Sequence, residues 1–169
     1  MVKSVDLLNL CEARKIMSNI IINKSETADT RTCDFSKVTK DTLLNSSRQH
    51  IKDVMKGFDF FIERMENAAL LHDNTKITEI DGFYDDFKTG FEKQDWYKMH
   101  QDKERHHLKN KEYVQDDVNL VDVFEMVIDC VMAGLARSGK YTHEDIDPEV
   151  LQKAVKNTAD MLIKAVSVK

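Results

Sequence analysis

The residues best suited to chemistry stand together in the stretch N-A-A-L-L-H-D-N-T-K, from Asn67 to Lys76. An apolar helix end is followed there by His72 and Asp73. Burying an imidazole beside a carboxylate is unfavourable unless something pairs with them. One explanation is a divalent ion, because neutral imidazole and carboxylate oxygen suit Mn²⁺, Fe²⁺, Co²⁺ or Zn²⁺. The alternative is an ordinary core histidine that is hydrogen-bonded and inert.

A second histidine, His50, lies 22 positions before His72. On one straight helix this spacing would separate the two side chains by about 33 Å. They meet only if the chain reverses between them, at Gly57 or at the junction of Glu66 and Asn67. We expect the break at the junction, with the two helices packed antiparallel so that both histidines reach one place.

An acidic stripe follows on a predicted helix over residues 118–137. Asp122, Glu125 and Asp129 are spaced i, i+3 and i+7, which places them on one face. Such a face is usually solvated. Here no Lys or Arg occurs between residues 111 and 137 to pair the acids, and the same face carries apolar side chains. Unpaired carboxylates on a buried helix are well placed to hold a cation.

The segment H-Q-D-K-E-R-H-H supplies three of the six histidines, His100, His106 and His107. One interpretation is a charged, solvated helix. The other is that these imidazoles bind the same ion or a second one. The spacing alone does not choose between the two.

Taken together, these residues resemble the metal-binding motif of the HD-domain superfamily. That pattern has an upstream His, then A-x-L-L-H-D with Lys or Glu three residues on, and a distant Asp. More closely, the chain is similar to an uncharacterised group of small HD-like proteins of bacteria and phages. The similarity covers about residues 47–139 and includes H-I-x-x-V, H-D-x-x-K, W-x-x-x-H, R-H-H and D-V-F-E-M-V-I-D.

The resemblance implies an all-α fold that holds one or two divalent ions (Mn²⁺, Fe²⁺, Co²⁺, Zn²⁺ or Mg²⁺). The implied ligands are His50, His72, Asp73 and Asp129. The three histidines of residues 100–107 would contact phosphate or hold a second metal. Glu125 and Asp122 would support the ligands or a second ion.

The activity implied by the resemblance is hydrolysis of a phosphate ester, most often in a nucleotide. Asp73 and Lys76 would act in catalysis, and Lys76 suits phosphate binding better than base catalysis. Two alternatives stay open. One is a metal-containing protein without catalysis that binds a nucleotide or inhibits a protein, as a phage would encode. The other is a purely structural helical protein.

The elements that must position these residues are predicted to be helices. One proline and five glycines argue against a turn-rich β fold. We expect a single HD-like domain of six to seven helices over residues 1–169, with its core at about 40–140. Helices over residues 4–23 and 148–167 would flank that core, for lid formation or dimerisation.

The composition limits the compartment and the partners. With a net charge of −5, the surface as a whole does not attract duplex nucleic acid or acidic membranes. Three cysteines without a C-x-x-C pair fit a reducing cytoplasm. No signal peptide or membrane-spanning run is apparent. We therefore expect a cytoplasmic protein of a bacterium or of a phage-infected host. Its expected partner is a small phosphorylated substrate, and a homo-oligomer is compatible with the sequence.

Overall fold

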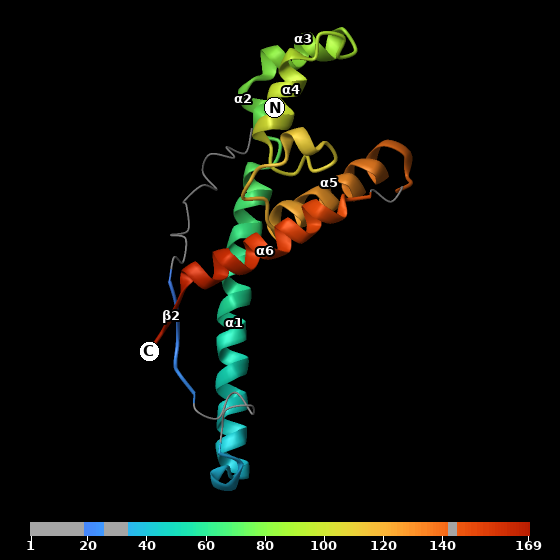
Figure 1. Cartoon of the computed structure of the whole chain (residues 1–169). Coiled ribbons are helices and arrows are strands. Elements are labelled where there is room, and N and C mark those ends of the chain that lie inside the picture. The colour runs from blue at the N-terminus through green and yellow to red at the C-terminus, as the bar shows by residue number, and fades with distance from the viewer. Residues whose placement is uncertain (1–18, 26–33, 142–144) are drawn as a thin grey trace, which may run out of the picture. The chain divides into compact units, whose positions relative to one another are not determined.

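The computed structural model describes residues 19–25, 34–141 and 145–169. The chain divides into two compact units, Met1–Arg64 with Lys164–Lys169, and Met65–Ile163. The fold is all-α, as predicted, with one short sheet (Figure 1). Within the described ranges, no helix combines the length and the apolar character needed to cross a membrane.

The first unit contains the only strands of the described chain. β1 (Ile20–Ile22) pairs in parallel with β2 (Val166–Val168). The prediction of helix at residues 20–23 and 166–167 is therefore wrong, and residues 4–18 lie outside the described part. Three consecutive β-branched isoleucines favour an extended chain over a helix, which explains the difference. The Lys56 ammonium donates to the Ile21 carbonyl at 2.7 Å and so fastens β1.

Helix α1 (Lys40–Leu71) begins in the first unit and ends in the second. It runs without interruption through Glu66 and Asn67, so the predicted break at that junction is wrong. Neither residue is a helix breaker, since Asn costs less than about 1 kcal/mol in a helix interior. The chain turns only at His72. The reversal required to bring His50 to His72 is thus absent, and His50 is exposed on α1.

Apart from the 3₁₀ turn η2 (Phe35–Lys37) of the first unit, the second unit carries the remaining helices of the described chain. They are α2 (Asn74–Thr78), α3 (Ile80–Lys88), α4 (Asp95–Lys103), the 3₁₀ turn η3 (Lys111–Tyr113), α5 (Leu120–Ser138) and α6 (Pro148–Ala165). Two predicted boundaries are confirmed: α5 ends before Gly139, whose φ is 67°, and α6 begins at Pro148, where Asp147 accepts from the Glu149 N–H at 2.8 Å.

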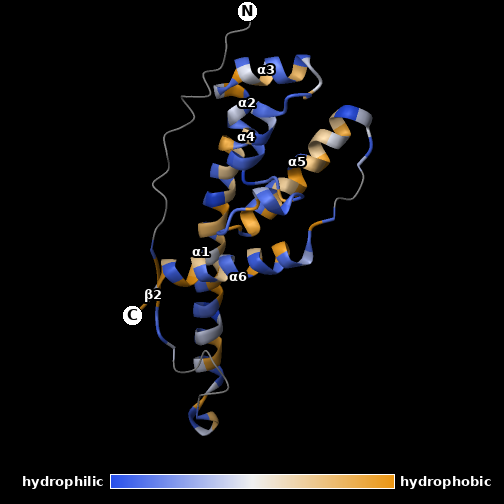
Figure 2. Ribbon diagram, turned by 45° about the horizontal axis from the view of Figure 1, so that its top comes forward, coloured by the Kyte–Doolittle hydropathy of each residue, from blue (hydrophilic) through white to orange (hydrophobic). Residues whose placement is uncertain are grey.

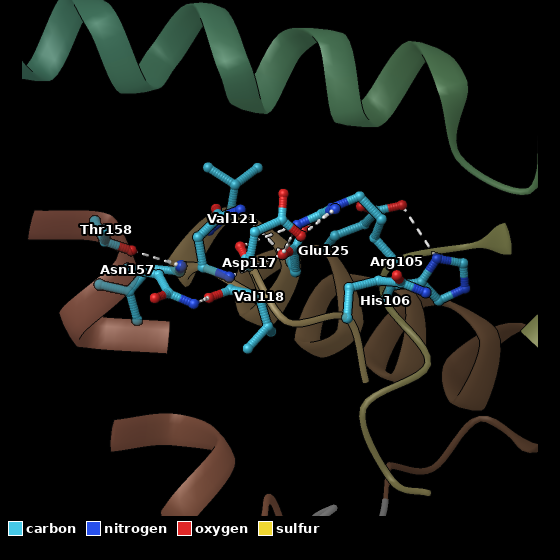
Figure 3. Close-up of polar contacts among 12 residues, drawn as sticks. Arg105, His106, Asp117, Val118, Val121, Glu125, Asn157 and Thr158 are labelled. Carbon is cyan, nitrogen blue, oxygen red and sulfur yellow. Dashed lines mark hydrogen bonds and ion pairs between the residues drawn. The ribbon is translucent and has the colours of Figure 1, made fainter. Parts of the chain in front are cut away.

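The core of the second unit lies between α5, α6 and the loop that leads into α5. Its buried members are Leu108, Val118, Val123, Met126, Val150 and Ala154. Figure 2 shows α5 coloured largely as hydrophobic, with a hydrophilic C-terminal end. Side chains of α6 also form hydrogen bonds with backbone groups at the end of this loop and the start of α5. Asn157 donates to the Val118 carbonyl at 2.8 Å, and Thr158 accepts from the Leu120 N–H at 2.8 Å (Figure 3).

Helices α3 and α4 pack through an aromatic stack. The Trp96 ring lies between Phe83, at 4.4 Å between centroids, and His100, at 4.7 Å. The buried Asp86 carboxylate accepts from the Tyr97 N–H at 3.0 Å and so caps α4 from α3. A Cβ at Gly82 would lie 3.1 Å from the Trp96 ring, so a larger residue there would have to displace the ring by a few tenths of an ångström. The stack therefore fixes the position of His100.

An ion pair between a half-buried arginine and a buried aspartate connects the loop after α4 to the start of α5. The Arg105 guanidinium donates to both oxygens of Asp122, Nε at 2.8 Å and Nη2 at 2.9 Å (Figure 3). Asp122 also accepts from the Asn119 N–H at 2.9 Å and completes the N-terminal capping box of α5. The hydrogen bonds to Asp122 raise the pKa of Arg105 above its usual value. Asp122 is thus paired by an arginine outside the window that the sequence analysis considered.

We predict that Arg105→Ala destabilises the second unit by about 2–3 kcal/mol, because it leaves the Asp122 carboxylate buried without its cation. Urea denaturation measures the change. Lys103→Ala, an exposed position two residues earlier, is the matched control and should change stability by less than about 0.5 kcal/mol. Equal effects of the two substitutions would contradict a structural role for the pair.

Candidate metal centre

The centre begins at the sharp turn between α1 and α2, where His72 and Asp73 stand. Asp73 has φ 53° and ψ 24°, a left-handed conformation that costs most non-glycine residues about 1–3 kcal/mol. Asp73 occupies the N-cap position of α2, yet its side chain makes no capping hydrogen bond. The strained turn therefore directs the carboxylate away from the helix end and toward the histidines.

Glu125 on α5 holds two of those histidines. One oxygen, Oε1, lies 2.9 Å from His72 Nδ1. The same oxygen lies 3.1 Å from His106 Nδ1 (Figure 3). Burial raises the pKa of the Glu125 carboxyl, but the hydrogen bonds to His106 and His72 outweigh it and keep the pKa below its usual value. An ionised carboxylate only accepts, so both imidazoles carry hydrogen on Nδ1. When neutral, each ring therefore presents a lone pair on Nε2.

His100 is held in the same tautomer by different groups. The Thr75 hydroxyl donates its one hydrogen to Glu104 Oε1 at 2.6 Å, so it must accept from His100 Nδ1, also at 2.6 Å. The Thr75 N–H donates to the same Glu104 oxygen at 2.9 Å. Burial lowers the pKa of His100, and the ring is neutral with its lone pair on Nε2. That atom lies 3.4 Å from Asp73 Oδ1.

Asp73 lies where these lone pairs converge. Its Oδ1 is buried and has no hydrogen-bond partner among the described residues. Besides His100, the His106 Nε2 atom lies 3.8 Å from it. Its Oδ2 lies 3.4 Å from His72 Nε2, which is in turn 3.5 Å from Asp129 Oδ1. Acceptors that face each other beyond hydrogen-bond distance repel one another unless a cation stands between them.

His107 adds another such acceptor. Its Nε2 is buried and has no partner in the described chain. Burial, with His106 and His100 close by, lowers the pKa of His107 to about 3, so the ring is neutral at physiological pH. Its ring centroid lies 4.7 Å from that of His100. The imidazole is therefore ready to act as a metal ligand rather than as a proton donor.

Two sets of three ligands result. They are His72, His106 and Asp129, and Asp73, His100 and His107, with one ligand atom from each residue within 4.8 Å of the others in its set. Metal–ligand bonds of about 2.0–2.3 Å place neighbouring ligands about 3–4.5 Å apart, which agrees with this spacing. Asp73 also approaches the first set through His72. These residues can hold one or two divalent ions.

The structure brings together most of the predicted residues. His72, Asp73 and Asp129 meet as expected, and His106 joins them. His50 belongs to neither set of ligands. Its assignment as a ligand, which depended on the absent chain reversal, is withdrawn.

Two further predicted residues lie beside other partners. The Lys76 ammonium forms an ion pair with Asp73 Oδ2. Burial raises the pKa of Asp73, but Lys76 outweighs this and lowers the pKa. Asp122 binds Arg105 instead of supporting a ligand directly, so its predicted role beside the metal is corrected. The prediction was wrong because it looked for a basic partner only between residues 111 and 137, whereas Arg105 precedes that range.

Sequence reasoning missed Thr75 and Glu104, which orient His100. Both positions offered a signal, because Thr75 follows the His72-Asp73 pair closely and Glu104 directly precedes R-H-H. Buried hydroxyl and carboxylate groups next to candidate ligands commonly fix the tautomer of a histidine. Without a fold, however, nothing indicated that these two residues face each other across 29 positions.

We predict that Glu125→Gln weakens metal binding about 10–100-fold, since an amide orients two imidazoles less firmly than a carboxylate does. Titration with Zn²⁺ or Mn²⁺ measures the affinity. Nitrogen NMR of the metal-free protein gives a second readout, in which the Nδ1–H tautomers of His72 and His106 should be lost in the variant. Unchanged affinity together with unchanged tautomers would refute the orienting role.

In comparisons with known proteins, no family model, curated protein or solved structure matches this chain.

Proposed function

We propose that this protein is a metal-dependent phosphohydrolase that cleaves a phosphate ester, with a nucleotide as the expected substrate. The observation that carries the proposal is the convergence of imidazole lone pairs and carboxylate oxygens on Asp73, whose buried Oδ1 has no donor in the described chain. A cation at Oδ1 resolves this electrostatic conflict, because Lys76 pairs with Oδ2 and no side chain described in the structure donates to Oδ1.

The proposed division of labour follows from the positions of the groups. Asp73, between the two sets of ligands, would hold the ion or bridge two ions. A bound divalent ion supplies an acidified water molecule and a Lewis acid for a phosphoryl oxygen. Asp129, with 31% of its side chain exposed, would orient that water and accept its proton. Lys76 would balance charge on the phosphoryl oxygens if the ion released it from Asp73.

The resemblance to HD-domain proteins supports the proposal with one departure. The order His72-Asp73, then Lys76, then the distant Asp129 agrees with the HD pattern. The upstream histidine of that pattern has no counterpart in the candidate centre, since His50 is absent from it. We propose that His106, which shares a set of ligands with His72 and Asp129, takes the place that the pattern gives to the upstream histidine.

A cavity beside the centre supports a phosphorylated substrate over a structural metal. It has a volume of about 560 Å³ and is lined by His106, His107 and Asp129. Structural metal sites are closed by their ligands, whereas catalytic sites keep an open position. The exposed edge of Asp129 on this cavity is such an opening.

We predict that the purified protein binds about one or two Mn²⁺, Fe²⁺, Co²⁺ or Zn²⁺ ions per chain and unfolds at higher temperature when loaded. Elemental analysis and thermal denaturation measure both. Affinity should fall on acidification, because a proton competes for His106. Burial alone would lower the pKa of His106. The hydrogen bond to Glu125 and the nearby carboxylates outweigh burial, so the pKa of His106 lies above its usual value. Absence of metal, with no thermal shift on adding any of these ions, would reject the centre.

We predict that Asp73→Asn abolishes metal-dependent phosphohydrolase activity and metal uptake while changing the stability of the metal-free protein by less than about 1 kcal/mol. Asparagine tolerates the left-handed conformation as well as aspartate does, so the turn is preserved. Its amide can also donate to an imidazole lone pair. Mn²⁺-dependent release of phosphate from a panel of nucleotides and urea denaturation measure the two effects.

The control is Glu112→Ala, an exposed position on η3 outside the centre, which should leave activity and metal uptake unchanged. His72→Ala should behave like Asp73→Asn in the activity assay. If the wild-type protein binds metal but releases phosphate from no nucleotide, it is a metal-containing binding protein and the hydrolase proposal fails. If all three substitutions have equal effects, the centre is misplaced.

A further inference from the structure

The cavity beside the metal centre has a charge unlike that of the whole chain. The net charge of the protein is −5. Among the described residues, the cavity is nevertheless lined by three cations, Lys109, Arg137 and Lys140, against the one carboxylate of Asp129. If Asp129 is occupied by the metal centre, the remaining described Lys, Arg, Asp and Glu side chains of the lining are all cations. A cavity with this balance favours an anionic occupant.

Two of these cations, Arg137 and Lys140, lie at and just after the C-terminal end of α5, beyond the candidate ligand Asp129. Asp129 and Arg137 are eight residues apart on α5, which corresponds to about 12 Å along the helix axis. The cavity-lining residues between them on the same face, Cys130, Ala133 and Gly134, bear no charge. The cavity therefore offers a site for anions at each end, separated by a largely uncharged middle.

The position of Lys140 is fixed by the backbone. Gly139 has φ 67°, which turns the chain back at the end of α5. The Ser138 hydroxyl donates to the Lys140 carbonyl at 3.1 Å and holds the turn. A Cβ at Gly134 would lie 3.1 Å from the same carbonyl, so the segment packs closely on α5. Lys140 thus belongs to the cavity wall.

Arg137 and Lys140 are also available to a ligand. Among the described residues, neither the guanidinium of Arg137 nor the ammonium of Lys140 has an ion-pair partner, and both residues are exposed. By contrast, Lys76 already pairs with Asp73. A cation without a partner can give its full interaction to an arriving anion, and arginine binds phosphate or carboxylate through two parallel hydrogen bonds.

A second cavity at the centre is unsuited to such a substrate. It has a volume of about 290 Å³ and is lined chiefly by apolar residues of α1 and α5, such as Ala68, Phe124 and Met132. Among the described residues that line it, Glu125 and Asp129 are acidic and none is Lys or Arg. Because an anion would be repelled there, the cationic cavity is better suited to admit a phosphate ester to the centre.

From these observations we infer that the substrate carries two anionic groups about 12 Å apart, one at the metal centre and one between Arg137 and Lys140. This inference rests on the proposed function, because the reacting group is taken to be the phosphate ester at the centre. The second group is a phosphate or a carboxylate, and the body between the two is uncharged. A simple monophosphate would leave the Arg137 end of the cavity without a partner.

The test uses alkylphosphonates, whose carbon–phosphorus bond is not hydrolysed, so that binding is separated from turnover. Mn²⁺-loaded protein is titrated calorimetrically with α,ω-alkane bisphosphonates of increasing length and with monophosphonates of the same lengths. We expect the bisphosphonate whose phosphorus atoms span about 12 Å to bind about 10–100-fold more tightly than its monophosphonate partner. Equal affinities at every length would overturn the inference.

Arg137→Gln and Lys140→Gln should each lower the ratio of bisphosphonate affinity to monophosphonate affinity about tenfold. Both substitutions should leave the monophosphonate affinity unchanged. Lys156→Gln, an exposed lysine on α6 away from the cavity, is the matched control and should remove none of it. A preference that persists in the Arg137→Gln, Lys140→Gln double variant would also overturn the inference.

Hydrolysis of p-nitrophenyl phosphate by the same Mn²⁺-loaded protein separates the two proposals. Turnover without a bisphosphonate preference would support the phosphohydrolase proposal and reject the second anion-binding site between Arg137 and Lys140. A bisphosphonate preference that depends on Arg137, without turnover of this probe or of any nucleotide, would support the two-anion site and reject the hydrolase.

Discussion

The candidate centre depends on the two hydrogen bonds that Glu125 accepts from His72 and His106. These histidines come from segments that are distant in the sequence, and one oxygen of one carboxylate determines the tautomer of both. If Glu125 were an apolar residue, either nitrogen of each ring could carry the hydrogen, and the lone pairs would not point together. With Glu125 ionised, both Nε2 atoms face the carboxylates of Asp73 and Asp129, so the geometry of the ligands follows from a group that is not itself a ligand.

Much of the second unit serves to deliver its histidines to this point. The Arg105–Asp122 pair fastens the start of the R-H-H segment to α5, and the Trp96 stack together with Thr75 fixes His100. The cost of this arrangement is visible in the left-handed Asp73 and in its unpaired buried oxygen. Strain and unsatisfied polar groups that occur together in one place are typical of functional sites, because selection for stability alone would remove both.

Local features could be predicted from the sequence, whereas long-range ones could not. The limits of α5 and α6 follow from a glycine and a proline, whose backbone restrictions act over one or two residues. The meeting of His72-Asp73 with Asp129 was predicted because the resemblance to a known pattern supplied the long-range information. The break at Glu66 and Asn67 was wrong because Asn67, although a favoured N-cap residue, costs little inside a helix and does not end α1. The partner of Asp122 was missed because Arg105 lies in another segment of the chain.

The loss of His50 from the centre changes how the metal and the fold are related. All residues of the two sets of ligands, together with Glu125, Thr75 and Glu104, belong to the second unit. Ligand geometry therefore depends only on packing within that unit, whose core joins α5 and α6 to the loop after the R-H-H segment. The first unit contributes no ligand among its described residues. An ion bound only by the folded second unit would stabilise that unit selectively, so metal binding and the packing of α5 would reinforce each other through the same helix that carries Glu125, Asp129 and Arg137.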